Sequence, residues 1–269
     1  MLSFPTITAV EVPRQRVLHP AEEMVNAAAA AGFRGVGIDW FSVRDAERRG
    51  VSVESLGESA AALGLTWTDM SALGLGADTA HDERAAASMA RRCAALGVGV
   101  CGLVVSVALD DSVYDRIARS ADIFAAAGVR LALEFVPYTQ VRTLDAARAV
   151  CERVGRAQLG LLIDTLHLAR SGGSADDIAQ LSPDEIAAVQ IADAVDIAPA
   201  DLATESRESR RLPGKGSLDI AGFAAALSQC GWTGVVSTEV LSADLRSLPA
   251  AALAGACANS ARRYFPEPC

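Results

Sequence analysis

The chain has 269 residues, of which 51% are hydrophobic and 21% are charged, and its net charge at neutral pH is -9. This composition excludes a disordered, low-complexity protein, and the length suits a single α/β barrel, which commonly needs about 250 residues. The acidic balance argues against a nucleic-acid partner, because phosphate binding requires a concentrated basic surface and the 24 Lys and Arg residues are scattered.

Short runs rich in Val, Ile and Leu recur along the chain and predict eight strands. The runs are residues 7–12, 35–40, 65–70, 98–107, 129–136, 159–166, 187–194 and 234–240. Alanine-rich segments separate them, and several of these segments end in "AAGF", "LGL" or "AAGV", where glycine can adopt the left-handed conformation that ends a helix. Such alternation indicates parallel strands with crossover helices, and eight units close a barrel. We therefore predict an α/β fold with a single (β/α)8 TIM barrel domain over residues 1–269.

The amino terminus lacks the basic segment and long apolar run of a secretion signal, and no apolar run reaches the roughly 18 residues of a membrane span. We therefore expect a cytoplasmic protein with no membrane partner. Six cysteines without a CxxC pair indicate neither a zinc knuckle nor a disulfide framework, so we expect small apolar core residues or, for Cys269, an unpaired terminal thiol.

Each of the last four predicted strands has an oxygen-bearing side chain at or near its end, where barrels carry their chemistry. These side chains are Glu134 in "LALEFV", Asp164 in "LLIDTL", Gln190 in "AAVQIADA" and Glu239 in "VVSTEV". Taken singly, such a residue is more often a helix cap or a salt-bridge partner. Three carboxylates in apolar surroundings are different, because burying like charges is costly unless a cation offsets them. The all-oxygen set predicts a hard divalent cation, Mg²⁺ or Mn²⁺, rather than zinc.

These segments resemble the sugar phosphate isomerase/epimerase superfamily of xylose-isomerase-like TIM barrels. Its members include ketose 3-epimerases, inosose isomerases and dehydratases, and 3-dehydroshikimate dehydratases. The resemblance covers nearly the whole chain and is carried by the D-x-x-H element of "LLIDTLHLAR" and the P-G-x-G element of "RRLPGKG". It implies that Glu134, Asp164 and Glu239 are metal ligands. Most members have histidine where this chain has Gln190, and some dehydroshikimate dehydratases have glutamine there.

The resemblance also implies two substrate contacts. His167 is similar to the family histidine that binds or polarises a substrate oxygen without binding the metal. Arg210 matches the arginine of the pattern R-x-x-P-G-x-G, and its neighbour Arg211 remains the alternative. Pocket, core and capping roles all remain open for four residues near earlier strand ends, which are Asp39, Trp40, Asp69 and Tyr138.

The family arrangement implies an isomerase or epimerase that acts on a sugar or keto-cyclitol, a polyhydroxylated carbonyl compound. In that reaction the cation stabilises the enediolate that forms when an α-proton leaves, and Glu134 and Glu239 serve as base and acid in either order. The close alternative is a dehydratase of the dehydroshikimate or inosose type, in which a β-hydroxyl group is expelled. A barrel phosphodiesterase, disfavoured by only three histidines and the acidic charge, and a non-catalytic binding protein are further alternatives. Assembly into a homo-oligomer also remains open.

Overall fold

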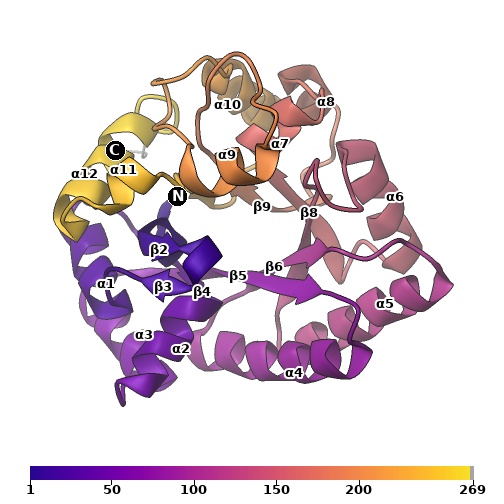
Figure 1. Ribbon diagram of the computed structural model, residues 1–269, viewed down its shortest axis with the longest axis horizontal. Coiled ribbons are helices and arrows are strands. Elements are labelled where there is room, and N and C mark those ends of the chain that lie inside the picture. The colour runs from indigo at the N-terminus through magenta and orange to yellow at the C-terminus, as the bar shows by residue number, and fades with distance from the viewer. Residues whose placement is uncertain (267–269) are drawn as a thin grey trace.

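The computed structural model describes residues 1–266, in which eight parallel strands close into one barrel with helices around it (Figure 1). The strands follow one another around the barrel in the order β1-β10-β9-β8-β7-β6-β5-β4. Their bounds are β1 Leu2–Pro5, β4 Gly35–Asp39, β5 Thr66–Leu75, β6 Val100–Val105, β7 Arg130–Glu134, β8 Leu159–Asp164, β9 Ile186–Gln190 and β10 Val236–Ser237. The predicted α/β class and eight-stranded barrel are confirmed.

The prediction of a barrel strand at residues 7–12 is wrong, because the first barrel strand is the preceding β1. After β1 the chain forms a 3₁₀ turn, η1 (Thr6–Ala9), and then β2 (Val10–Glu11), which pairs antiparallel with β3 (Arg16–Val17) in a separate two-stranded sheet. The run is apolar for another reason. Ile7, Val10 and Val12 form a small cluster with Leu241, apart from the main core.

Helices cover the outside of the barrel (Figure 1). They are α1 Ala21–Ala30, α2 Trp40–Arg48, α3 Val53–Ala62, α4 Thr79–Leu96, α5 Asp111–Ala126, α6 Leu144–Val154, α7 Thr165–Arg170, α8 Ala175–Ala179, α9 Leu202–Glu208, α10 Ile220–Gln229, α11 Ala243–Arg246 and α12 Ala250–Ala261, with a 3₁₀ turn η2 at Val12–Arg14. The predicted glycine ends are present. Gly97 and Gly128 follow α4 and α5 with φ angles of 71° and 74°, a conformation that costs other residues energy.

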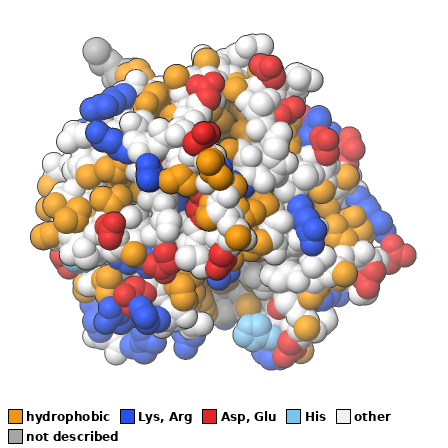
Figure 2. Space-filling view, turned by 45° about the horizontal axis from the view of Figure 1, so that its top comes forward, with side chains coloured by type: hydrophobic (Ala, Val, Ile, Leu, Met, Phe, Trp, Pro, Cys, Tyr) orange, Lys and Arg blue, Asp and Glu red, His pale blue; other side chains and the backbone are white. Residues whose placement is uncertain are grey.

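The main core lies between the strands and the surrounding helices, as expected for parallel strands covered on both faces. Five cysteines, Cys93, Cys101, Cys151, Cys230 and Cys257, are free and buried, and Cys269 lies outside the described residues. Within residues 1–266, no helix combines the length and the apolar character needed to cross a membrane. On the face shown in Figure 2, Lys and Arg side chains occupy several separate places, with acidic and apolar side chains beside them.

The barrel closure at β1 provides a stability test. Phe4 is fully buried and stacks on Phe33, with ring centroids 5.3 Å apart. We expect Phe4→Ala to lower the free energy of unfolding by about 3–5 kcal/mol, because a closed barrel cannot collapse around the space left by the ring. Urea unfolding followed by circular dichroism measures the loss. Leu63→Ala, at a 44% exposed position, is the control, and an equal loss in both variants would contradict this assignment of the core.

Candidate active site

The four side chains predicted to share a cation come together at the carboxyl ends of neighbouring strands. Glu134, Asp164 and Gln190 are the last residues of β7, β8 and β9, and Glu239 lies two residues beyond β10. The strands are parallel, and Asp164 is directly paired with Gln190 in the barrel register. All four side chains are largely buried, with Asp164 completely inaccessible. Adjacent parallel strands thus position three of the four side chains directly, and Glu239 lies in the short segment that follows β10.

The guanidinium of Arg210 lies within this acidic group. Its Nη1 donates a hydrogen bond of 2.6 Å to Asp164 Oδ2, and its Nη2 lies 3.2 Å from Glu239 Oε2. Its Nε also donates to the backbone carbonyl of Ser206 at 2.7 Å, so the group is fixed from two directions. Arg210 is only 3% exposed, whereas Arg211 is exposed. The structure therefore brings Arg210, and not Arg211, to the carboxylates.

Asp193, which the sequence analysis did not single out, holds the P-G-x-G loop that follows Arg210. Its Oδ2 accepts the backbone N–H groups of Gly214 and Gly216, each at 2.9 Å, and its Oδ1 accepts that of Leu218 at 3.0 Å. A side chain on Gly216 would collide with the carbonyl of Ala194, which explains that glycine. The signal in the sequence was an aspartate three residues beyond Gln190 that had no assigned role.

His167 lies in the first turn of α7, directly after β8. Asp164 caps this helix, since its Oδ1 accepts the backbone N–H of His167 at 3.0 Å. The imidazole Nε2 lies 3.4 Å from Glu134 Oε1 and 3.5 Å from Ser206 Oγ. The D-x-x-H spacing therefore has a structural cause, because the acid starts the helix that presents the histidine.

The donor set fits a hard divalent cation by its chemistry. Gln190 Nε2 donates to Glu239 Oε1 at 2.9 Å, whereas Gln190 Oε1 is buried and has no hydrogen-bond partner among residues 1–266. Three ionised carboxylates and one guanidinium sum to a charge of -2, which a divalent cation would offset through its preferred oxygen ligands. In the described part of the chain no three Asp, Glu, His or Cys side chains are already grouped as a metal site, and Arg210 binds two of the carboxylates.

Burial and neighbouring charges shift the pKa values of these groups in different directions. Burial, with the charges of Glu239 and Asp164, raises the pKa of Glu134 well above its usual range. Burial raises the pKa of Glu239 to about 7, although Arg210 opposes the shift. Burial acts to raise the pKa of Asp164 too, but the charges of Arg210 and His167 and the hydrogen bonds from both residues together lower it. Burial lowers the pKa of His167 to about 4, so the imidazole is neutral at pH 7.

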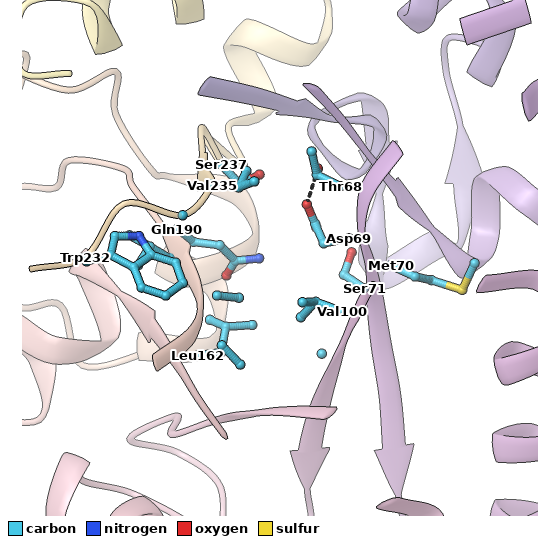
Figure 3. Close-up of a pocket in the computed structure, with 15 residues that line it drawn as sticks. Thr68, Asp69, Met70, Ser71, Val100, Leu162, Gln190, Trp232, Val235 and Ser237 are labelled. Atoms are coloured by element: carbon cyan, nitrogen blue, oxygen red, sulfur yellow. Dashed lines mark hydrogen bonds between the residues drawn. The ribbon is translucent and has the colours of Figure 1, made fainter. Parts of the chain in front are cut away.

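A cavity of about 440 Å³ opens beside Glu134, His167, Arg210 and Glu239. Two of the residues left open by the sequence, Trp40 and Tyr138, line this cavity. The other two do not. Asp39 caps α2 instead, and Asp69 lines a second cavity deeper in the barrel (Figure 3).

The model of the xylose isomerase-like TIM barrel family matches residues 25–261. The chain belongs to this family. Two curated relatives are 3-dehydroshikimate dehydratase of Pseudomonas aeruginosa, 34% identical over 153 residues, and inosose isomerase of Bacillus subtilis, 30% identical over 149 residues. These matches cover 56% and 55% of this chain but only 24% and 52% of the two relatives. The chain thus spans about a quarter of the first relative and about half of the second.

Solved structures share the fold along almost the whole chain. A structure of IOLI protein with a bound zinc atom has a TM-score of 0.85 and 22% identity, and the match covers 98% of this chain and 97% of that one. A xylose isomerase-like TIM barrel/4-hydroxyphenylpyruvate dioxygenase fusion protein has a TM-score of 0.84 and 24% identity, with 98% and 42% covered. At these identities the likeness establishes the fold.

The raised pKa of Glu239 predicts that stability without divalent cations falls as the pH rises. The unfolded carboxyl ionises near its ordinary pKa of 4.5 and the folded one near 7, so the unfolded state loses its proton first. Between these values the free energy of unfolding should fall by roughly 3 kcal/mol. Urea unfolding in a chelator from pH 4.5 to 8 measures the slope. Glu239→Gln should flatten it and the exposed Glu58→Gln should not, and equal slopes in all three proteins would contradict the prediction.

Proposed function

We propose that the protein removes a proton next to the carbonyl of a hydroxylated ketone and returns a proton at the same or another carbon, as an isomerase or epimerase. One observation carries this proposal: two buried carboxyls with raised pKa values, Glu134 and Glu239, border a single cavity. A general acid or base works best when its pKa lies near the working pH. Paired carboxyls in different environments can supply one ionised and one protonated partner.

The remaining polar groups of the site suit the oxygens of such a substrate. The ionised carboxyl takes the α-proton, and the protonated carboxyl delivers one. The neutral imidazole of His167 exchanges a hydrogen bond with a substrate oxygen, and Arg210 places a fixed positive charge where negative charge develops. Gln190 keeps Glu239 oriented through the 2.9 Å hydrogen bond between them.

A divalent cation completes the proposed site. Its ligands would be Glu134, Asp164, Gln190 and Glu239, and when bound it supplies Lewis-acid polarisation of the substrate carbonyl. The all-oxygen ligands favour Mg²⁺ or Mn²⁺. The zinc atom mentioned above is bound in the structure of IOLI protein, and the similarity of that structure to this chain is evidence for the fold alone.

The relatives suggest the class of substrate. Inosose and 3-dehydroshikimate, which appear in the names of the two curated relatives, are both hydroxylated six-membered carbocyclic ketones. A cavity of about 440 Å³ is within the usual range for small-molecule sites, roughly 300–1,000 Å³. We therefore propose a keto-cyclitol, rather than an open-chain sugar, as the first candidate substrate.

Reaction in deuterated water tests the proposal. The protein, supplied with Mg²⁺ or Mn²⁺, should incorporate solvent deuterium next to the carbonyl of inosose without forming a new chromophore. Glu134→Gln and Glu239→Gln should each lower the rate by about 10²–10⁴-fold, because each removes a proton-transfer group. Mass spectrometry and NMR measure the incorporation, with Glu58→Gln as the control. Wild-type protein that exchanges no deuterium in any keto-cyclitol would contradict the proposal and favour a binding protein.

Arg207 favours a second candidate, a dehydratase acting on a ring that carries a carboxylate. Its exposed side chain lines the cavity of about 440 Å³ that we propose as the substrate cavity. Its guanidinium carbon lies 5.8 Å from the centre of the Tyr138 ring. This guanidinium has no hydrogen bond or ion pair with another residue in the range 1–266. 3-Dehydroshikimate has a carboxylate that a guanidinium can bind, whereas inosose has none. 3-Dehydroshikimate already contains an enone, and loss of water leaves a ring that tautomerises to an aromatic dihydroxybenzoate with a new ultraviolet absorption.

Arg207→Gln separates the two candidates. If the substrate is a carboxylate, we expect its KM to rise about tenfold with kcat little changed, because the lost contact lies away from the reacting carbons. The KM for inosose should not change. Arg84→Gln, at an exposed position on α4, is the control. An unchanged KM for 3-dehydroshikimate would remove Arg207 from substrate recognition.

A further inference from the structure

A second cavity, of about 220 Å³ and called the lower cavity, lies inside the barrel below the ends of β9 and β10. Gln190 and Asp69 reach into it from opposite sides of the barrel, and Trp232 forms part of its wall (Figure 3). Ser71 lines both this lower cavity and the substrate cavity. The two spaces are therefore neighbours along the barrel axis.

The lower cavity exists because small side chains occupy the middle of the barrel. Alternate residues of a strand face the same side, so Ala188 and Ser237, two positions before Gln190 and Glu239, point inward one layer lower. Gly102 contributes no side chain at all. Bulky branched residues normally fill this region of a TIM barrel, and here Leu162 is one of few that do. The layer below the site is consequently underfilled.

Polar atoms in the wall of this cavity lack partners. Ser237 Oγ and Trp232 Nε1 are buried and make no hydrogen bond within residues 1–266, and Gln190 Oε1 is a third such atom. Ser237 is only 3% exposed. If the cavity is dry, each of these polar groups loses the hydrogen bond that it makes to water in the unfolded chain. Asp69 accepts a hydrogen bond of 2.6 Å from Thr68 through Oδ1, and no hydrogen bond to its Oδ2 is made in this part of the chain.

We propose that the lower cavity holds a chain of ordered water molecules that bond to Ser237, Trp232 and Asp69. At about 30 Å³ per molecule the volume accommodates roughly seven. Water is the occupant that fits, because it can accept a hydrogen bond from the indole N–H, exchange hydrogen bonds with the Ser237 hydroxyl and donate to the Asp69 carboxyl group. A cation would face the indole N–H, which is a donor, and an apolar molecule would leave every polar atom unsatisfied.

Under the proposed function, this water is connected by hydrogen bonds to the cavity that holds the substrate. Ser71, whose hydroxyl has no partner among the described residues, touches both cavities and can pass hydrogen bonds between them. Water in the lower cavity then reaches the floor of the substrate cavity while a substrate fills its mouth. This role rests on the proposed function, whereas the hydration itself rests only on the unpartnered atoms.

NMR spectroscopy of the full chain tests the hydration without any substrate. The three tryptophans give separate indole N–H signals, and Trp232→Phe identifies the relevant one. We expect a cross-peak between bound water and the indole N–H of Trp232. The indole of Trp67 is the internal control, because it is buried and donates to the carbonyl of Leu56 at 3.3 Å. A Trp232 signal with no water cross-peak would overturn the proposal.

Filling the cavity provides the matched comparison. Ala188→Leu should reduce the Trp232 water cross-peak at least fivefold, whereas Ala61→Leu on the exposed side of α3 should leave it unchanged. Should Ala188→Leu not fold, Ser237→Ala serves instead, and a crystal structure of it should lose the water bound at Oγ in the wild type. Density for an organic ligand, or an empty cavity, in the wild-type crystal would overturn the proposal. Inactivity towards keto-cyclitols would overturn the proposed function and leave the hydration intact.

Discussion

The buried guanidinium of Arg210 is the interaction on which the site depends. It lies between strand ends that bring three buried carboxylates close together, and it binds two of them directly. An unpaired buried carboxylate lowers the free energy of unfolding by several kcal/mol. Removing one partner of a buried ion pair therefore destabilises a protein more than replacing both partners with apolar residues. The arginine keeps Asp164 ionised while Glu134 and Glu239 remain free to hold protons near neutral pH.

The barrel strands and the long connection between β9 and β10 each supply part of the site. Strand ends supply the acidic groups, whose positions are fixed by backbone pairing. The connection between β9 and β10 supplies Arg210, Arg207 and Ser206, which face the substrate cavity. Asp193 anchors this connection by accepting hydrogen bonds from its backbone N–H groups, so the loop that carries Arg210 is tied to the end of β9.

The position of each side chain along the barrel axis explains both cavities. The top layer is acidic and partly closed by Arg210, while the layer below combines small residues with isolated polar groups. Gln190 belongs to both, because it bonds to Glu239 and also lines the lower space. Its side chain therefore lies between the acidic group and the lower cavity.

The sequence by itself determined the barrel fold and which side chains gather at the ends of its last four strands. Periodic apolar runs give strands, and residues at the ends of consecutive parallel strands must meet. It did not determine the first strand, because four residues, Leu2–Pro5, give a weaker signal than the apolar run after them, which packs against Leu241.

Only the tertiary structure decided which arginine enters the acidic group, that Asp193 anchors the loop, and that the barrel interior is underfilled. The choice of Arg210 depends on the path of a connection whose length alone does not define its conformation. The lower cavity depends on small residues contributed by several strands, and the space that they leave unfilled forms only when the barrel closes. Local patterns specify elements, whereas charge pairing and unfilled space arise between residues far apart in the chain.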